Sequence, residues 1–479
     1  MALGSISIEQ QPVQTSDKVP VITNWTPIVP YTIKQTEITG LFYFKFVLEI
    51  RLDDATGTLL GRLKQRQNGY TTGTTDVYTT FDIRNIVNTQ IEKTYADQNA
   101  TAYPIHTLGA NTGATTKIYS KNSNQVKKVF VKAYQSYASS ATIVPSFDDS
   151  PNATDTLYYI AASLPLQTAR TTGAYFQGTA FQTYQMQNVN SKFLSDLQPT
   201  FCEETNSTII RTHIQDGDYH TLAFLNGVDL FNGAVQKITV KYYNADGTAN
   251  GSPSSFTNSS TAGGAVSDSG ATISLAEHLL YFGCGVANLE GYDDGGSNAH
   301  RPSNHSGWAY YTIQATNTNG AVFRSALYYF IKQTASCKGF KSRRLAWTNS
   351  KGGYDYFTFN MKSTQTLDVT RNTYGKLIGD FNSTEYSYQN YESSKKVREV
   401  QATLSETLNT DYITEEDAQL LENLIMSTDV FMVQNADTDF TVPVMVTDNK
   451  IVRKTGANNK VKIQYTIKIE YSNPINTNS

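Results

Sequence analysis

The chain has 479 residues and a mass of 53.1 kDa, which is too long for one compact core and predicts roughly two to four domains. The 39 Lys+Arg residues nearly balance the 42 Asp+Glu residues, and the net charge of -3 leaves no basic surface that would favour nucleic acid. The sequence also has no run of about 18 apolar residues, so neither nucleic-acid sequence recognition nor membrane insertion is expected.

Composition and cysteines indicate the broad class. Charged residues make up 17% of the chain and aromatic residues 12%, which is typical of β-rich proteins whose surfaces contact other proteins. Cys202, Cys284 and Cys337 are widely separated and odd in number, so we expect free thiols in a reducing compartment. The opening sequence MALGSISIEQQ has neither a basic segment nor an apolar run and predicts no secretory signal.

The N-terminal part predicts an extended arm followed by a β-sandwich. Residues 1–35 contain several prolines and little periodicity, which indicates an arm lying on another surface. Residues 36–196 then predict the first sandwich. Alternation in LFYFKFVLEIRL places one face at Phe42, Phe44, Phe46, Leu48, Ile50 and Leu52. FDIRNIVNTQIEK predicts a short helix with Asp82 near its start, and KVFVKAY and TLYYIAASLPL predict further strands.

Residues 197–365 predict a second sandwich. Its strand candidates are STIIRTHI, YHTLAFLNGV, AVQKITVKYY and HLLYFGCG. A long Gly/Ser-rich loop is expected at residues 244–271. Asn319-Gly320 between two aromatic-rich runs predicts a hairpin.

Residues 366–479 predict a small α+β domain. KKVREVQATL indicates a strand, and TEEDAQLLENLIMS a helix with Thr414 as its N-cap. The last strand, VKIQYTIKIEY, alternates apolar with polar residues and predicts one buried and one exposed face. The expected fold is therefore mainly β: antiparallel β-sandwiches in several domains with an α+β domain at the C-terminal end.

No motif for catalysis or cofactor binding stands in the sequence. HExxH, CxxC, GxSxG, GxGxxG and the Walker loop do not occur, so we predict no catalytic residue, cofactor or metal site and no enzymatic activity. The densest polar cluster joins Asp293 and Asp294 to His300, and an exposed turn is favoured there over a metal or ligand loop. Paired glycosidase carboxylates leave no spacing signal, so that class stays open.

The segment RRLAWTNSKGGYDYFTFN, residues 343–360, predicts a structural hairpin. Asn349 would close the turn through its side chain, Gly352 and Gly353 would supply positive φ angles, and Lys351 would lie exposed at the tip. Trp347 would anchor a core or interface. The arginines are expected to be solvated or to pair between subunits. The candidate hairpin and interface residues are Arg343, Arg344, Trp347, Asn349, Gly352, Gly353, Tyr354 and Tyr356.

Three segments carry a resemblance to a known group of proteins: SALYYFIKQTASCKGFKSRRLAWTNSKGGYDYFTF, the earlier YFGCGVANLE, and LLENLIMSTDVFMVQNADTDFTVPVMVTD with the strand that follows it. This C-terminal half resembles virion structural proteins of tailed bacteriophages, in particular neck and tail ring or tail-tip proteins of crAss-like and other Bacteroidota or marine phages. The resemblance implies a virion component without enzymatic activity, assembled in the bacterial cytoplasm.

Composition and resemblance together favour a homo-oligomeric ring in the neck or tail, with partners on the portal-adaptor or tail-tube side. The alternative is a carbohydrate-binding or carbohydrate-cleaving protein at the tail tip or a surface, with exposed tyrosines as stacking platforms. A ring protein would place its aromatic residues in subunit contacts, whereas a glycan-binding protein would keep an aromatic groove open.

Overall fold

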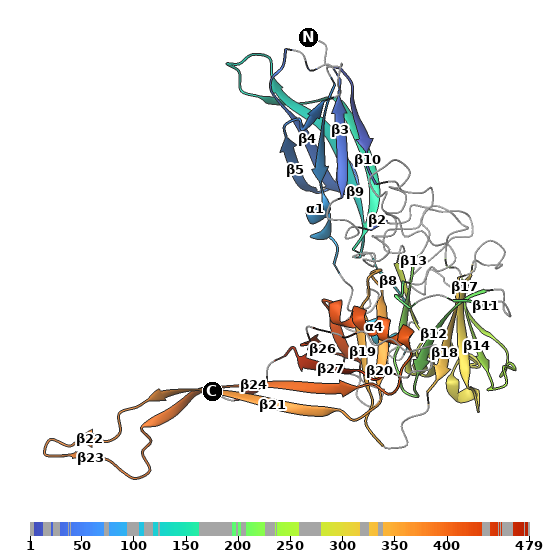
Figure 1. Cartoon of the computed structure of the whole chain (residues 1–479), viewed down its shortest axis with the longest axis vertical. Coiled ribbons are helices and arrows are strands. Elements are labelled where there is room, and N and C mark those ends of the chain that lie inside the picture. The colour runs from blue at the N-terminus through green and yellow to red at the C-terminus, as the bar shows by residue number, and fades with distance from the viewer. Residues whose placement is uncertain are drawn as a thin grey trace. The chain divides into compact units, whose positions relative to one another are not determined.

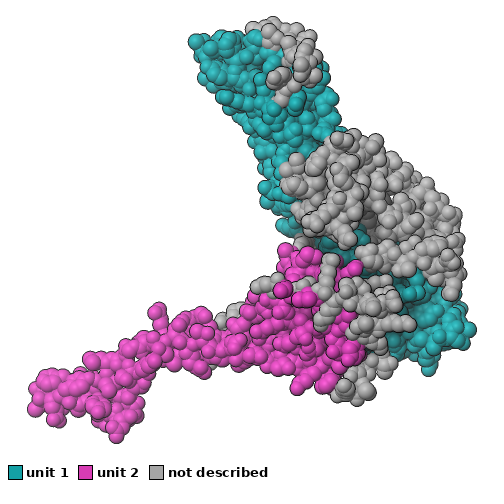
Figure 2. Space-filling model, viewed as in Figure 1, with its two compact units in different colours: residues 1–333, 349–355 teal, residues 334–348, 356–479 magenta. Residues whose placement is uncertain are grey.

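Figure 1 shows the computed structural model of the chain, which is built almost entirely from β-sheets, as the sequence predicts. It separates into two compact units: unit 1 comprises residues 1–333 and 349–355, and unit 2 comprises residues 334–348 and 356–479 (Figure 2). The division near residue 333 lies earlier than the predicted boundary at 365/366. The structure describes residues 4–12, 21–22, 29–36, 38, 40–70, 76–92, 105–109, 118–122, 125–161, 194–197, 200–202, 207–225, 235, 237–257, 279–316, 325–333, 339–433, 441–448, 450, 452, 463–473 and 475–477.

Unit 1 begins with a sandwich of two sheets. One has the order β1 (Ile6–Gln10), β3 (Pro30–Gln35), β7 (Val77–Asp82) and β6 (Gly69–Tyr70); the other has the order β2 (Val21–Ile22), β10 (Ser146–Ile160), β9 (Val126–Ala138), β4 (Phe42–Leu52) and β5 (Leu59–Gln65). The two sheets meet in the interior, where the hydroxyl oxygens of Tyr31 and Tyr159 are 2.8 Å apart. Short helix α1 (Arg84–Asn88) follows β7, and Asp82 accepts the N–H of Arg84 at 3.0 Å, near the predicted helix start.

Two sequence expectations fail in this sandwich. The segment 1–35 is not an arm lying elsewhere, because β1 and β3 pair with each other and β3 pairs with β7 inside the first sheet. Its prolines concealed this pairing, since Pro30 occupies the first position of a strand, where proline is tolerated. In β4 the alternation holds only in part: Val47 and Glu49 are buried together with Phe46, Leu48 and Ile50, whereas Phe42 is 43% exposed.

The second half of unit 1 contains a six-stranded and a three-stranded sheet. The larger has the order β11 (Thr200–Cys202), β12 (Ser207–Ile214), β18 (Leu327–Lys332), β17 (Tyr310–Thr316), β14 (Lys237–Tyr243) and β15 (Ser254–Thr257); the smaller has the order β13 (Thr221–Leu225), β16 (Leu279–Gly283) and β8 (Tyr119–Asn122). Helix α3 (Val286–Gly291) and the 3-10 turns η1 (Ile105–Thr107) and η6 (Pro302–Asn304) complete it.

Several predictions for this half can be compared with the structure. Strands β17 and β18 pair antiparallel, as the hairpin signal predicts, while the Asn319-Gly320 turn lies outside the described residues. Within the predicted 244–271 loop, Ser254–Thr257 form β15 and pair with β14, and residues 258–271 lie outside the described part of the chain. Cys284 is buried outside any disulfide, and its thiol donates to the carbonyl oxygen of His220 at 3.3 Å; the side chains of Cys202 and Cys337 lie outside the described part of the chain.

Unit 2 is built on one eight-stranded sheet with the order β20 (Tyr354–Phe359), β19 (Arg343–Thr348), β25 (Val430–Val433), β26 (Thr441–Val446), β27 (Thr466–Tyr471), β24 (Lys395–Asn409) and β21 (Thr364–Gly375), and with β28 (Ile475–Thr477) paired to β24. Helix α4 (Glu415–Met426) begins at Thr414, which forms the expected cap with Asp417. In the last long strand Ile467 and Ile469 are buried and Lys468 is exposed, as predicted. A small ladder, β22 (Asp380–Phe381) with β23 (Tyr386–Ser387), lies between β21 and β24 in the chain.

Candidate functional site

The hairpin 343–360 exists, and its turn is closed as the sequence predicts. The side-chain oxygen of Asn349 accepts the N–H groups of Lys351 at 3.1 Å and Gly353 at 2.9 Å. Gly352 has a φ of +87°, a conformation that favours glycine. Gly353 does not have the predicted positive φ. It must be glycine for another reason: a Cβ there would lie 2.3 Å from the carbonyl oxygen of Leu194.

Within unit 1, the turn docks on the segment 194–196 through two carboxylates. Asp355 accepts the hydroxyl of Ser195 at 2.6 Å and the backbone N–H of Asp196 at 2.8 Å. Asp196 in turn accepts the backbone N–H of Ser350 at 2.8 Å and the hydroxyl of the same residue. All four carboxylate oxygens are therefore occupied by donors from the chain itself.

This carboxylate pair anchors the turn. Asp355 is 1% exposed, and burial, together with the nearby charge of Asp196, raises the pKa of Asp355 to about 7. Sequence reasoning did not find Ser195, Asp196 or Asp355, because the partners are separated by more than 150 positions and form no local pattern.

Lys351 is not the free, exposed tip that the sequence predicts. Its ammonium group donates to the backbone carbonyl of Ser195 at 2.6 Å. The neighbouring aromatic ring of Tyr354 is 1% exposed and meets the ring of His106 edge-on, with centroids 4.7 Å apart. The whole turn is therefore a packing element of unit 1.

In unit 2 both arginines of the hairpin have partners within the unit. Arg343 donates to the buried carboxylate of Glu406 at 2.8 Å. Arg344 is 4% exposed; it donates to the Thr358 hydroxyl at 2.6 Å, and its guanidinium lies 5.3 Å from the ring centre of Tyr356. Trp347 is fully buried, as predicted.

Glu406 is held as an anion within unit 2. Besides Arg343, it accepts hydrogen bonds from Gln365 at 3.1 Å and Tyr471 at 2.9 Å. Burial alone would raise the pKa of Glu406, but the hydrogen bonds from Gln365, Ser363 and Arg343 outweigh burial and lower it. The carboxylate thus ties together β19, β21, β24 and β27.

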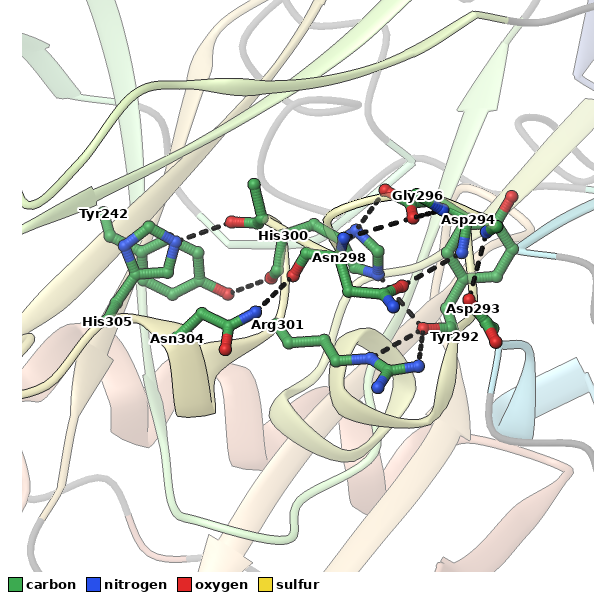
Figure 3. A network of polar contacts seen from close by, with 12 residues as sticks. Tyr242, Tyr292, Asp293, Asp294, Gly296, Asn298, His300, Arg301, Asn304 and His305 are labelled. Carbon is green, nitrogen blue, oxygen red and sulfur yellow. Dashed lines mark hydrogen bonds and ion pairs between the residues drawn. The ribbon is translucent and has the colours of Figure 1, made fainter.

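The loop around Asp293, Asp294 and His300 forms the polar network of Figure 3. Asp294 accepts the backbone N–H groups of Gly296 at 2.7 Å and Asn298 at 3.2 Å, and its second oxygen lies 3.4 Å from the His300 ring. Burial lowers the pKa of His300, against the opposing effects of its contacts with Tyr292 and Asp294.

The hydrogen-bond donors in this loop favour a structural turn over a metal-binding loop. Amide hydrogens that point at a carboxylate satisfy the carboxylate and would repel a cation. The Tyr292 carbonyl is likewise filled, because both Nε and Nη2 of Arg301 donate to it, at 3.0 and 2.8 Å. Among the described residues no group of three or more His, Cys, Asp or Glu side chains has the arrangement of a metal site.

A tyrosine ladder crosses three strands on one face of the six-stranded sheet. The rings of Tyr243 and Tyr310 stack with centroids 4.8 Å apart and an interplanar angle of 9°, and Tyr310 stacks with Tyr329 at 5.6 Å and 24°. The middle ring is therefore covered on both faces. A sugar ring stacks on a free aromatic face, so Tyr310 cannot serve as a platform.

An exposed antiparallel β-ribbon, residues 364–399, projects from unit 2, and it is two-stranded beyond Arg371, because β27 and β28 pair with β24 only between Val400 and Asn409. Strands β21 and β24 continue beyond the sheet and end in the β22–β23 ladder (Figure 1). No side chain between Thr364 and Glu399 is buried. Sequence reasoning had assigned KKVREVQATL only as a strand of the C-terminal domain and did not predict a projecting ribbon.

The two faces of the ribbon differ in character. The register pairs Leu367 with Leu404 and Thr373 with Val397 on one face, and Thr370 with Gln401 on the other. Leu367 is 54% exposed and Val397 50% exposed. This face therefore exposes Leu367, Val369 and Val397, and it also carries the charged side chain of Arg371. The other exposed large side chains of the ribbon are Val369, Tyr374, Leu377, Phe381, Tyr386, Tyr388 and Tyr391.

Comparison with known proteins adds no family. No family model matches the chain, and no curated protein matches it. Among solved structures the chain is similar to a Salmonella alpha-2-macroglobulin reacted with methylamine, at 8% identity and a TM-score of 0.17. The alignment covers 100% of this chain and 30% of that chain, and so low a score carries no argument. No helix in the described part of the chain is long and apolar enough to cross a membrane.

Proposed function

We propose that this protein is a structural subunit of a tailed bacteriophage particle, where copies of the chain assemble into a ring in the neck or tail. The observation that supports assembly is the β-ribbon. A two-stranded ribbon is marginally stable in water; this ribbon is two-stranded beyond Arg371, and it exposes large apolar side chains, among them Val397, Phe381 and Tyr391. Each large apolar side chain gains about 1.5–3 kcal/mol when it is buried, so contact with another chain would stabilise the ribbon.

The phage assignment is supported by the resemblance of the C-terminal half to neck and tail proteins. A virion location, assembly in the host cytoplasm and partners on the portal-adaptor or tail-tube side follow from that resemblance. The proposed role is structural and involves no catalysis.

The glycan-binding alternative requires open aromatic faces. The tyrosine ladder does not favour it, since Tyr310 lies between Tyr243 and Tyr329. The exposed rings that this alternative would use are those of the β-ribbon, Tyr388 and Tyr391 among them; we propose the assembly function because the ribbon exposes aliphatic side chains as well.

Electron microscopy of purified particles, with a label attached to this protein, tests the proposal. We expect a ring-shaped density at the neck or tail that carries the label in several symmetric copies. Absence of the protein from particles, or a single copy without rotational symmetry, would contradict the proposed function.

A further inference from the structure

The β-ribbon carries opposite charges at its two ends. Its tip, residues 377–394, contains Asp380, Glu385 and Glu392 and no Lys or Arg. Its shaft, the remaining residues of 364–399, contains acidic residues only at Asp368 and Glu399, against the basic residues Arg371, Lys376, Lys395, Lys396 and Arg398. The tip is therefore negative and the shaft positive.

Both ends also expose apolar surface. At the tip Phe381 and Tyr386 lie directly opposite each other on β22 and β23, and they are 61% and 51% exposed. Tyr391 is 85% exposed. On the shaft, Val369 and Val397 belong to the apolar face and are 37% and 50% exposed. A contact between tip and shaft would therefore join apolar surface to apolar surface and acidic groups to basic groups.

The tip cannot reach its own shaft. Strands β21 and β24 are paired continuously from Thr364 with Thr407 to Gly375 with Lys395, apart from one bulge after Asn372. This ladder keeps the ribbon extended, so only another molecule can bring a tip to the shaft. A second copy of the chain presents both complementary surfaces. Shaft-on-shaft or tip-on-tip packing would place like charges together, which is unfavourable.

We propose that the ribbon tip of one copy docks on the ribbon shaft of a neighbouring copy, and that this contact is the self-association interface. The inference rests on the proposed assembly function and names the surfaces that perform it. Acidic tip side chains lie against the lysines and arginines of the neighbouring shaft, while the aromatic tip covers the apolar face of that shaft.

Charge reversal in the full-length chain tests this pairing. A tip variant carries Asp380→Lys with Glu385→Lys, and a shaft variant carries Lys395→Glu with Lys396→Glu. Glu392 is left unchanged because it accepts the backbone N–H of Gly379 at 2.7 Å and helps to form the tip. The matched control, Lys341→Glu with Lys450→Glu, reverses two exposed lysines outside the ribbon. Self-association is measured by sedimentation velocity at low ionic strength, and folding by thermal unfolding.

We expect each ribbon variant alone to associate at least about tenfold more weakly than wild type, with an unchanged unfolding temperature, while the control behaves as wild type. An equimolar mixture of the tip and shaft variants should recover association, because every tip then meets a shaft of opposite charge. The inference is wrong if wild type associates and both charge reversals leave its affinity unchanged, or if the mixture of the two variants does not associate. Either result would leave the proposed assembly function intact. A wild-type protein that stays monomeric at all concentrations overturns both.

Discussion

The carboxylate of Asp355 accepts the hydroxyl hydrogen of Ser195 at 2.6 Å, although 160 positions separate the two residues in the chain. This contact fastens the turn of the 343–360 hairpin to the segment 194–196 of unit 1. It also buries the acid beside Asp196, and burial together with that neighbouring charge raises the pKa of Asp355, although the hydrogen bonds that its carboxylate accepts from Ser195 and Asp196 oppose the shift. The hairpin turn is consequently sensitive to pH.

The raised pKa of Asp355 sets the direction of that sensitivity. The folded chain holds the proton up to about pH 7, whereas the unfolded chain releases it near the usual value of 3.8. Between these values the folded state binds more protons, so the free energy of unfolding falls as pH rises and levels off above about 7. The total change due to this group is on the order of 4 kcal/mol, since each unit of pKa difference corresponds to about 1.4 kcal/mol.

Asp355→Asn imitates the protonated carboxyl and should remove this contribution. Its amide can donate to Ser195 while its oxygen accepts from Asp196. Thermal unfolding from pH 5 to 8 should give a smaller loss of stability with pH for Asp355→Asn than for wild type. Asp368→Asn, at an exposed position of the ribbon, is the control and should keep the wild-type slope. Equal slopes for Asp355→Asn and wild type would show that Asp355 is ionised in the folded protein.

Substitution of either glycine in the hairpin turn should destabilise the fold, but for a different physical reason at each position. Gly353→Ala places a Cβ at 2.3 Å from the Leu194 carbonyl oxygen and 2.9 Å from the Leu194 Cβ, so we expect a loss of about 1–3 kcal/mol from overpacking. Gly352→Ala has more room, with its nearest contact at 3.2 Å, but keeps a φ of +87°, which costs about 1–2 kcal/mol.

A D-alanine at position 352, introduced by chemical ligation, tests the backbone account of Gly352. D-alanine favours positive φ and should restore stability there. Chemical denaturation measures the effect, and a D-alanine variant as unstable as Gly352→Ala would contradict the account.

Breaking the Arg343–Glu406 pair should destabilise unit 2 strongly. Arg343→Met leaves the Glu406 carboxylate, which is 0% exposed, without its cation, and such a loss typically costs about 3–5 kcal/mol. Adding Glu406→Gln removes the uncompensated charge while keeping a polar group for Gln365 and Tyr471, so the double variant should be more stable than Arg343→Met alone. A double variant that is less stable than the single one would show that Glu406 is stabilised without Arg343.

Local patterns predicted the elements of this fold well. The cap of α4 at Thr414, the alternation of Ile467, Lys468 and Ile469, and the Asn349 turn all depend on residues a few positions apart. The strands of residues 1–35 were missed, because pairing between β1 and β3 depends on a partner more than 20 positions away. Periodicity reports what a segment buries, and it does not report which strand lies beside it.

The candidate site was predicted less well. The sequence identified the hairpin and the burial of Trp347, but it placed Lys351, Arg343 and Arg344 in solvent or between subunits. The structure gives each of them a partner within the chain. Long-range partners such as Ser195 and Glu406 leave no spacing signal. The β-ribbon was missed for a different reason. Alternating apolar residues usually predict a strand whose apolar face packs against another layer, but no other layer in the described part of the chain covers the apolar side chains of the ribbon.

The most direct test of the assembly function compares the wild-type chain with a variant in which an Asn-Gly turn replaces residues 377–394, measured by mass photometry and by thermal unfolding. The account predicts that wild type forms a discrete oligomer, whereas the variant is monomeric and unfolds at the wild-type temperature, because the removed residues bury nothing within the chain. A variant that forms the same oligomer as wild type would contradict the claim that the ribbon joins the subunits.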